Sequence, residues 1–437
     1  MTVVRGLKLP PDPLLIARAL AGHPGLAVLA SRPEGATRAE DARWSFVACD
    51  PDCTSDDVVP PAEAGSADRT GWNGAPGAPR WVGVVPYEAL RGLERGRWTR
   101  SPDDRPSCAL RRAAWRRYPA VVRVDHFTGA VSVEADDEPS AGRVARAVDR
   151  GLRAALGGFE LDVLAPDEPD RAHTDRIHEA LRLIAAGDLY EVNLARRIPL
   201  LLRGDPLALF ESLLDAAPAP WGFFQDLGDT VVCGASPELA LSVRGDSLRT
   251  CPVKGTRPRG RDAMADEGWM RELDADPKER AELVMAVDVH RSDLGRVAVP
   301  GSVRVLGEPR VVAGRAVWSR VAEVVARRAP GVTLDDVASA VLPCGSVTGA
   351  PKVRAMEVIA SLEPWRRSAY TGVFGYVGRQ GALELAMAIR TIEVAKVGPE
   401  QPACYFAGGG IVADSIPERE LEETRWKATQ LSTLRHP

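Results

Sequence analysis

Residues 230–259 read TVVCGASPELALSVRGDSLRTCPVKGTRPR and contain two apolar stretches of the kind that forms β-strands. The Gly245-Asp246 pair between these stretches is typical of a tight turn. A tight turn joins strands that run in opposite directions, whereas parallel strands need a long crossover connection. The segment therefore favours an antiparallel sheet over a doubly wound parallel sheet.

Further predicted elements surround this hairpin. The stretch YPAVVRVDHFTGAVSVEAD predicts a second hairpin, with its turn at Thr128 and Gly129. The run TDRIHEALRLIAAGDL repeats apolar residues at helical spacing and is stopped by Gly187. Before this helix the stretch DVLAPDEPDR is typical of a loop, so we expect a boundary between residues 1–165 and residues 166–437.

The composition excludes several classes of protein. The 437 residues carry a net charge of −4, with 27% charged and 45% hydrophobic residues, which predicts neither a nucleic-acid nor a membrane partner. The N-terminus lacks the basic start and continuous apolar core of a signal peptide, so we expect a cytoplasmic protein. The seven cysteines form no CxxC pair and are odd in number, which predicts free thiols in a reducing compartment.

The C-terminal stretch at residues 414–427, DSIPERELEETRWK, predicts a helix that begins near a proline. Glu420, Glu423 and Lys427 recur at a spacing of three and four residues, so they share one face of this helix. The glycines at positions 408–410 precede the helix and predict an anion-binding nest of backbone N–H groups. A merely solvated charged face is the alternative interpretation.

A second charged helix is predicted in PKERAELVMAVDVHRSDLGR, where Glu279 and Glu282 lie one turn apart. Glutamates from two helices can share a Mg²⁺ ion, which prefers oxygen ligands and keeps several of its waters. A surface position or an ion pair is the alternative interpretation of Glu282. Spacing alone does not decide between them.

The segment PVKGTRPR places Lys254 in a predicted turn bounded by glycine and proline, with Glu238 on a neighbouring predicted strand. A lysine in a turn is usually solvated and charged. A lysine that acts as a nucleophile must be neutral, so burial or a nearby cation has to lower its pKa from about 10.4. The sequence leaves both interpretations of Lys254 open.

These motifs together resemble the chorismate-utilising enzyme family, which includes anthranilate synthase, isochorismate synthase and aminodeoxychorismate synthase component I. The resemblance runs through IAAGDLYEVNLARR, ASPEL, PVKGTRPRG, GSVTGAPKVRAMEVI, LEPWRR, AGGGIVADS and ELEET, and is weaker in the N-terminal third. It implies an α+β fold of two stacked antiparallel β-sheets with outer helices, the anthranilate-synthase-like chorismate-binding fold. The active site is then expected in a cleft between the halves.

The resemblance also implies which residues bind metal and substrate. Glu282 and Glu423 are the expected Mg²⁺ ligands, with Glu279 and Glu420 as further candidates. The chorismate carboxylates and ring would contact a larger set of side chains and backbone groups along the cleft, namely Thr348, Tyr370, Arg390, Gly408, Gly409, Gly410 and Lys427.

Position 254 separates the reactions of the family, since anthranilate and isochorismate synthases carry alanine there and aminodeoxychorismate synthases carry lysine. Lys254 therefore predicts amination of chorismate at C4, with Glu238 as the general acid and base. The product would be 4-amino-4-deoxychorismate, for 4-aminobenzoate and folate synthesis or a specialised pathway. Amination at C2, to 2-amino-2-deoxyisochorismate or anthranilate, and a noncatalytic partner of an amidotransferase remain the alternatives.

Two positions depart from the family pattern. Glu191 stands where aminating members usually have glutamine, and Ala316 stands where they have a histidine that assists aromatisation in anthranilate synthase. The missing histidine argues against anthranilate as the product. The sequence also shows no glutaminase signature, so we expect ammonia to come from solution or from a separate glutamine amidotransferase subunit.

Overall fold

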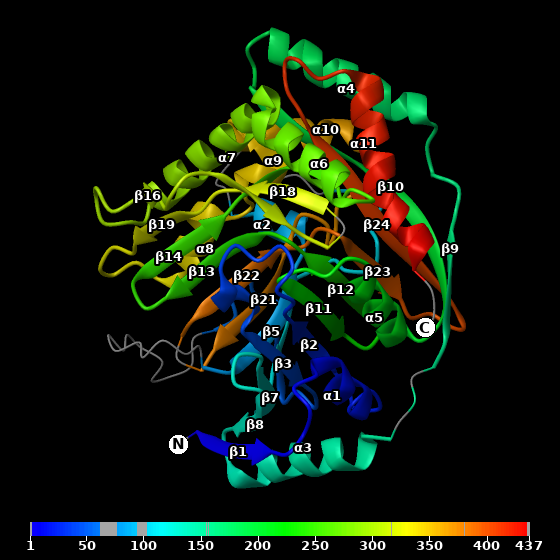
Figure 1. Cartoon of the computed structure of the whole chain (residues 1–437), viewed down its shortest axis with the longest axis vertical. Helices are drawn as coiled ribbons and strands as arrows, with labels where there is room; N and C mark the ends of the chain where they lie inside the picture. Colours follow the sequence, from blue (N-terminus) through cyan, green and yellow to red (C-terminus); the bar gives the residue numbers. More distant parts are fainter. Residues whose placement is uncertain are drawn as a thin grey trace.

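The computed structural model describes residues 2–61, 77–93, 103–153, 155, 157–315, 317–379 and 381–434, and these form two large antiparallel β-sheets and a small third one. Helices lie outside the sheets, with α4, α7, α10 and α11 at one end of the molecule and α1 and α3 at the other (Figure 1). The expected α+β fold is confirmed.

The first sheet has 12 strands. Its order is β1 (Val3–Leu7), β8 (Ala130–Ala135), β7 (Ala120–Asp125), β3 (Trp44–Ala48), β2 (Ala27–Ala30), β11 (Trp221–Asp226), β12 (Thr230–Ser236), β23 (Thr391–Ala395), β24 (Glu400–Ile411), β10 (Glu191–Gly204) and β20 (Gly349–Ala350), with β9 (Phe159–Val163) beside β10.

The second sheet has 9 strands and the third has 3. The second runs in the order β16 (Arg304–Val305), β19 (Val324–Arg327), β14 (Ser247–Cys251), β13 (Leu239–Arg244), β22 (Leu383–Met387), β21 (Val373–Gly378), β5 (Pro79–Val85), β6 (Ala114–Arg117) and β4 (Cys53–Ser55). The third is β15 (Val253–Pro258), β18 (Val317–Val321) and β17 (Arg310–Ala313).

The helices are α1 (Pro13–Ala19), α2 (Tyr87–Arg91), α3 (Glu138–Gly151), α4 (Asp170–Ala185), α5 (Pro206–Ala216), α6 (Ala263–Ala275), α7 (Pro277–Gly295), α8 (Leu334–Val341), α9 (Gly345–Thr348), α10 (Lys352–Leu362) and α11 (Pro417–Thr429). Two 3₁₀ turns, η1 (Ala39–Ala42) and η3 (Gln430–Thr433), complete the elements described.

The hairpin predicted from residues 230–259 is confirmed, since β13 and β14 pair antiparallel around Gly245, which has a φ of +62°. The predicted turn around Lys254 is wrong. The chain leaves the second sheet after Cys251, at the end of β14. Lys254 lies in the next strand, β15, which pairs with β18 in the third sheet. The partner strand lies more than sixty positions away, where a local sequence pattern gives no signal.

The two large sheets stack through an apolar layer. Phe223 of β11 in the first sheet stacks on Phe374 of β21 in the second, with ring centroids 3.6 Å apart and planes 15° apart. Buried side chains from both sheets surround this pair, among them Val84, Val232, Leu239 and others in the same cluster. Burial of each large apolar side chain contributes roughly 1.5 to 3 kcal/mol, so this layer fixes how the sheets sit on each other.

Strands from both sides of residue 165 are interleaved in the sheets. β2 pairs with β11 in the first sheet, and β5 pairs with β21 in the second. Neither part forms a large sheet alone. The boundary between residues 1–165 and residues 166–437 stays a prediction from the sequence.

Two cysteines contradict the prediction of free thiols. Cys108 and Cys404 form a disulfide, although 296 positions separate them in the sequence. The other cysteines, Cys49, Cys53, Cys233, Cys251 and Cys344, are free. Within the described ranges, none of the helices combines the length and the apolar character needed to cross a lipid bilayer.

Candidate active site

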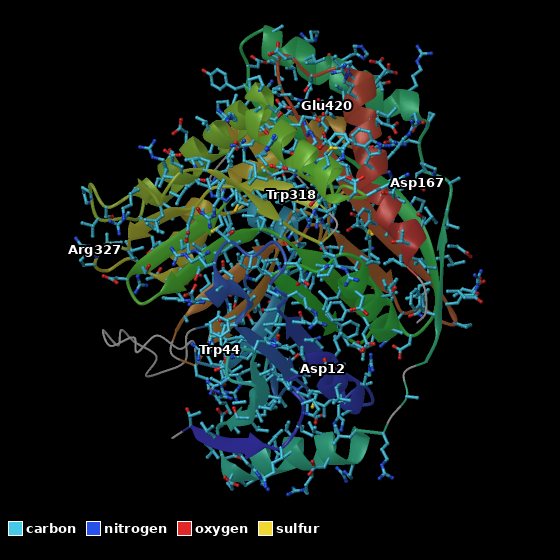
Figure 2. All side chains as sticks on the ribbon, in the orientation of Figure 1. Asp12, Trp44, Asp167, Trp318, Arg327 and Glu420 are labelled. Carbon is cyan, nitrogen blue, oxygen red and sulfur yellow. A yellow bond between two sulfur atoms is a disulfide. The ribbon has the colours of Figure 1, made fainter. Side chains whose placement is uncertain are left out.

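The site lies among the helices α7 and α11 and the strands β15 and β24. α7 begins after Asp276, whose side chain accepts hydrogen bonds from the first backbone N–H groups, and α11 packs along β24. Glu420 lies on the side of α11 that faces α7, as Figure 2 shows. Lys254 on β15 lies between these elements, because electrostatic interactions link it to carboxylates on several of them.

Lys254 is directed inward by a break in its strand. The register of β15 against β18 shifts between Lys254 and Thr256, and Gly255 between them has a φ of +71°. A side chain at Gly255 would meet the Glu279 carboxylate and the Leu273 methyl group at 2.8 Å. Glycine at this position therefore lets β15 bend closely past α7 and leaves Lys254 buried, with 9% of the residue exposed.

The Lys254 ammonium is paired with Glu191. Lys254 Nζ donates a hydrogen bond to Glu191 Oε1 at 2.5 Å, and Glu191 is only 1% exposed at the start of β10. Burial acts to lower the pKa of Lys254, but the carboxylates of Glu191 and Glu282 raise it above its usual value. The lysine is therefore buried, as a nucleophile requires, yet it is held in its charged form.

Glu238 is held by a neighbouring hydroxyl. It follows β12 and is 2% exposed, and Ser346 Oγ of α9 donates a hydrogen bond to its Oε1 at 2.5 Å. Burial raises the pKa of Glu238 to about 7, although Ser346 and Lys254 oppose the shift. A carboxyl group with this pKa can both give and accept a proton near neutral pH.

The three glycines of β24 provide space. Gly408, Gly409 and Gly410 pair with β10 as extended strand, so they do not form the predicted nest of N–H groups. A Cβ atom at Gly410 would lie 2.6 Å from Glu191 Oε1, and one at Gly408 would lie 2.9 Å from the Tyr370 hydroxyl. Glycine is needed here because charged and aromatic side chains approach the strand closely.

The carboxylates expected to bind metal lie on α7 and α11. Glu282 and Glu420 are 8% and 3% exposed, and burial raises the pKa of Glu282 to about 7. Burial acts to raise the pKa of Glu423 as well, but its partner Lys427, 2.6 Å away, lowers it below the usual value. Glu279, a further candidate, is instead paired with Arg257 at 3.1 Å.

These carboxylates are donors of the kind that a magnesium ion prefers. A Cβ atom at Gly409 would lie 3.5 Å from Glu420 Oε2 and 3.6 Å from Glu423 Oε1, so the two α11 carboxylates converge over a position without a side chain. All these donors are carboxylate oxygens, which Mg²⁺ prefers. The oxygens of Glu282, Glu420 and Glu423 are not gathered within 4.8 Å of one another.

Two positively charged side chains, Lys427 and Arg390, are the groups expected to bind the anionic parts of a ligand. Lys427 Nζ donates to the Gly408 carbonyl oxygen at 2.7 Å. Within the described part of the chain, no ion pair joins the Arg390 guanidinium to a carboxylate, and Arg390 lies at a φ of +52° between β22 and β23. Burial lowers the pKa of Arg390, and the planar shape of a guanidinium suits a carboxylate ligand.

Arg390 lines a small pocket that is open to solvent. The wall includes Pro237 and Val253, the neighbours of Glu238 and Lys254 in the sequence, but neither of those two charged side chains lines it. The other lining residues are mostly apolar and come from several loops and from the third sheet, namely Glu34, Gly35, Pro218, Ala219, Val312, Gly314, Val317, Ser319 and Val321.

Tyr370 and Thr348 occupy different settings. The Tyr370 ring stacks on Phe406 of β24, with centroids 5.4 Å apart, and its hydroxyl points toward Gly408. Thr348 is fully buried, and its hydroxyl donates to the Cys344 carbonyl oxygen at 2.9 Å. Tyr370 therefore faces the charged site, whereas the Thr348 hydroxyl proton is already engaged.

Sequence reasoning missed some members of the site. Asn193 donates to the Ser346 carbonyl oxygen at 3.1 Å and so ties β10 to the helix that holds Glu238. Lys278 lies one turn before Glu282, a spacing that could have been noticed as an ion-pair signal. Ala316, where the family has histidine, lies outside the described residues.

Known proteins resemble this chain in sequence and in fold. Residues 25–433 match the sequence profile of a family described as chorismate binding enzyme. The anthranilate synthase component 1 of Thermus thermophilus is 44% identical over 260 residues, which cover 60% of this chain and 55% of that protein. The chain thus spans little more than half of that relative's length.

Two further proteins extend the comparison. The aminodeoxychorismate synthase component 1 of Salmonella typhimurium is 40% identical over 257 residues, which cover 59% of this chain and 56% of that protein. The crystal structure of anthranilate synthase component I from Streptococcus pneumoniae TIGR4 superposes with a TM-score of 0.74 at 27% identity, covering 90% of this chain and 92% of that one. Since the family profile matches most of the sequence, the chain belongs to the chorismate binding enzyme family.

Proposed function

We propose that this chain is component I of an aminodeoxychorismate synthase, which replaces the C4 hydroxyl of chorismate by an amino group. The observation that carries the proposal is Lys254, a buried lysine whose ammonium lies among the carboxylates of Glu191, Glu238 and Glu282. A structural lysine seldom lies buried among three acids, because burying charge costs free energy. A catalytic role for Lys254 as a nucleophile explains why the protein buries this charge despite the cost in free energy.

Lys254 and Glu238 have different tasks in the proposed reaction. Lys254 loses its ammonium proton to water before the reaction and regains it afterwards. The neutral amine adds at C2 of the ring while the C4 hydroxyl takes a proton from Glu238 and leaves as water. Ammonia then adds at C4 as the lysine departs from C2, and the Glu238 carboxylate accepts the proton that the new ammonium loses. Both side chains thereby return to their starting state, and the pKa of about 7 for Glu238 suits the two transfers.

The metal and the carboxylate-binding groups have separate tasks. Glu282 and Glu423, with Glu420 beside them, would hold Mg²⁺, which when bound supplies positive charge to the ring carboxylate. Arg390 would bind the pyruvyl carboxylate, and Lys427, whose ammonium donates to the Gly408 carbonyl oxygen, would neutralise the other anionic group. Tyr370 would then contact the ring, and Thr348 would shape the pocket from behind.

A second candidate is amination at C2, to anthranilate or 2-amino-2-deoxyisochorismate. It is favoured by the Thermus relative, an anthranilate synthase component 1 with 44% identity. This reaction has no use for a lysine nucleophile at position 254. In both cases the name component 1 of the relatives supports a separate amidotransferase subunit as the source of ammonia.

The lysine distinguishes the two candidates. In Lys254→Ala we expect formation of the 4-amino product from chorismate, Mg²⁺ and ammonium to fall by roughly a thousandfold or more, because the nucleophile is gone. The matched control is Lys396→Ala, a surface lysine paired with Asp226 at 2.9 Å, which should retain wild-type kcat/KM. A 2-amino product made equally well by Lys254→Ala would establish the second candidate.

A further inference from the structure

Lys278 joins the two helices that carry the acids of the site. It lies in the first turn of α7, and its Nζ donates to Glu420 Oε1 of α11 at 3.0 Å. The same ammonium lies 3.6 Å from Glu282 Oε1, one turn further along its own helix. One positive charge thus spans the space between an acid of α7 and an acid of α11.

The settings of the two acids and the lysine differ. Glu420 and Glu282 are buried, with side chains 4% and 11% exposed, whereas the Lys278 side chain is 39% exposed. The acids therefore lie inside the protein, whereas the lysine reaches them from the solvent side on a flexible stem. Lys278 can move its ammonium into water without breaking the packing of either helix.

A magnesium ion and this ammonium compete for the same carboxylates. Mg²⁺ needs oxygen ligands at about 2.0 to 2.1 Å in a tight octahedron. The oxygens of Glu282, Glu420 and Glu423 are instead too far apart to form such a group, and the Lys278 ammonium lies between two of them. Two cations cannot share so small a space, because their repulsion at about 4 Å is strong even near a protein surface.

We propose that Lys278 is an internal counter-ion that competes with Mg²⁺ for Glu282 and Glu420 and is displaced when Mg²⁺ binds. The inference rests on the proposed use of Glu282, Glu420 and Glu423 as metal-binding groups. It adds that metal affinity is set by the lysine as well as by the acids. Displacement of the ammonium also frees α7 and α11 to close around the ion.

Nearby positive charges make different contacts. Arg257 pairs with Glu279, Asp276 and Glu272, so it is engaged with acids other than Glu282 and Glu420. Arg280, also on α7, lies 3.8 Å from Asp274 with more than half of its side chain exposed. Arg280 therefore provides a matched control, since its removal changes the helix charge equally without touching Glu282 or Glu420.

The test is calorimetric titration of Mg²⁺ into the full chain with chorismate present and ammonium omitted, so that no amination proceeds. We expect Lys278→Gln to bind Mg²⁺ roughly tenfold more tightly than wild type, because a competing charge at about 4 Å is removed. Arg280→Gln should differ from wild type by less than about threefold. Lys278→Arg keeps the charge and should stay close to wild type.

The outcomes separate this inference from the proposed function. Equal affinities of Lys278→Gln and Arg280→Gln, or weaker binding by Lys278→Gln, would overturn the counter-ion role while leaving the metal site intact. A wild-type chain that binds no Mg²⁺ would contradict the metal site itself and the counter-ion with it. If Lys278→Gln fails to fold, as judged by its melting curve, Lys278→Met at the same position provides the comparison.

Discussion

The layer between the two sheets and the charged site next to it bury opposite kinds of side chain. The layer consists of stacked rings and aliphatic groups around Phe223 and Phe374. The charged site buries Lys254 against Glu191, with Glu238 nearby. Apolar burial stabilises the fold, whereas burial of paired charges roughly breaks even or costs free energy. The layer accordingly supports the structure, and the charged site is retained for its chemistry.

The largest effect on stability is expected in the apolar layer. Phe374→Ala removes one ring of the cross-sheet stack, and we expect the free energy of unfolding to fall by about 3 to 5 kcal/mol. Urea unfolding followed by circular dichroism measures this loss. Phe127→Ala is the control, because its side chain is 55% exposed and should cost less than about 1 kcal/mol. Equal losses in the two variants would show that the stacked rings do not hold the sheets together.

Glu238→Gln tests the chemistry of the charged site. We expect the amination rate to fall by roughly a hundredfold to ten-thousandfold, because the proton donor is lost. The folded pKa of about 7 lies above the usual 4.5, so the wild type loses stability as the pH rises from 4.5 to about 7. The variant should lack that part of the loss, roughly 1 to 3 kcal/mol, when unfolding is measured at pH 5 and pH 8.

A second buried glutamate gives the matched control for that variant. Burial also raises the pKa of Glu393 to about 7, but Glu393 accepts hydrogen bonds from Ser368 and the backbone, outside the charged site. Glu393→Gln should therefore alter the pH dependence of stability and change the amination rate far less than Glu238→Gln. Equal rate losses would mean that Glu238 has only a structural role.

The smallest effect is expected at Glu191. Glu191→Gln removes the charge that holds Lys254 as an ammonium, so the pKa of the lysine falls and more neutral amine is present near pH 7. We expect the acid side of the pH–rate profile to move to lower pH, with a roughly several-fold faster reaction at neutral pH. A slower reaction would instead identify Glu191 as the acceptor of the lysine proton.

The sequence predicted the parts of the molecule that depend on local patterns. The hairpin around Gly245 and the helices that carry Glu282 and Glu423 follow from alternation, helical spacing and turn residues. The pairing of the Lys254 segment with β18 was missed, because its partner Arg320 lies far along the chain. The contact of Lys278 with an acid 142 positions away was missed for the same reason.

The glycines at positions 408–410 show a further limit. Three successive glycines indicate freedom of the backbone, and a nest of N–H groups was the predicted use of that freedom. The structure instead uses their lack of a side chain, since Glu191 and Tyr370 approach from other elements. Which of the two properties of glycine matters depends on tertiary neighbours that the local sequence does not name.

The central claim is amination of chorismate at C4, and the nature of the product tests it most directly. Purified protein is incubated with chorismate, Mg²⁺ and excess ammonium at mildly alkaline pH, and a 4-aminobenzoate-forming lyase is added to half of the sample. Mass-resolved chromatography should then show aminobenzoate only with the lyase, and only as the 4-isomer. A 2-amino product would contradict the role given to Lys254, and unchanged chorismate would contradict catalysis by this chain with ammonium alone.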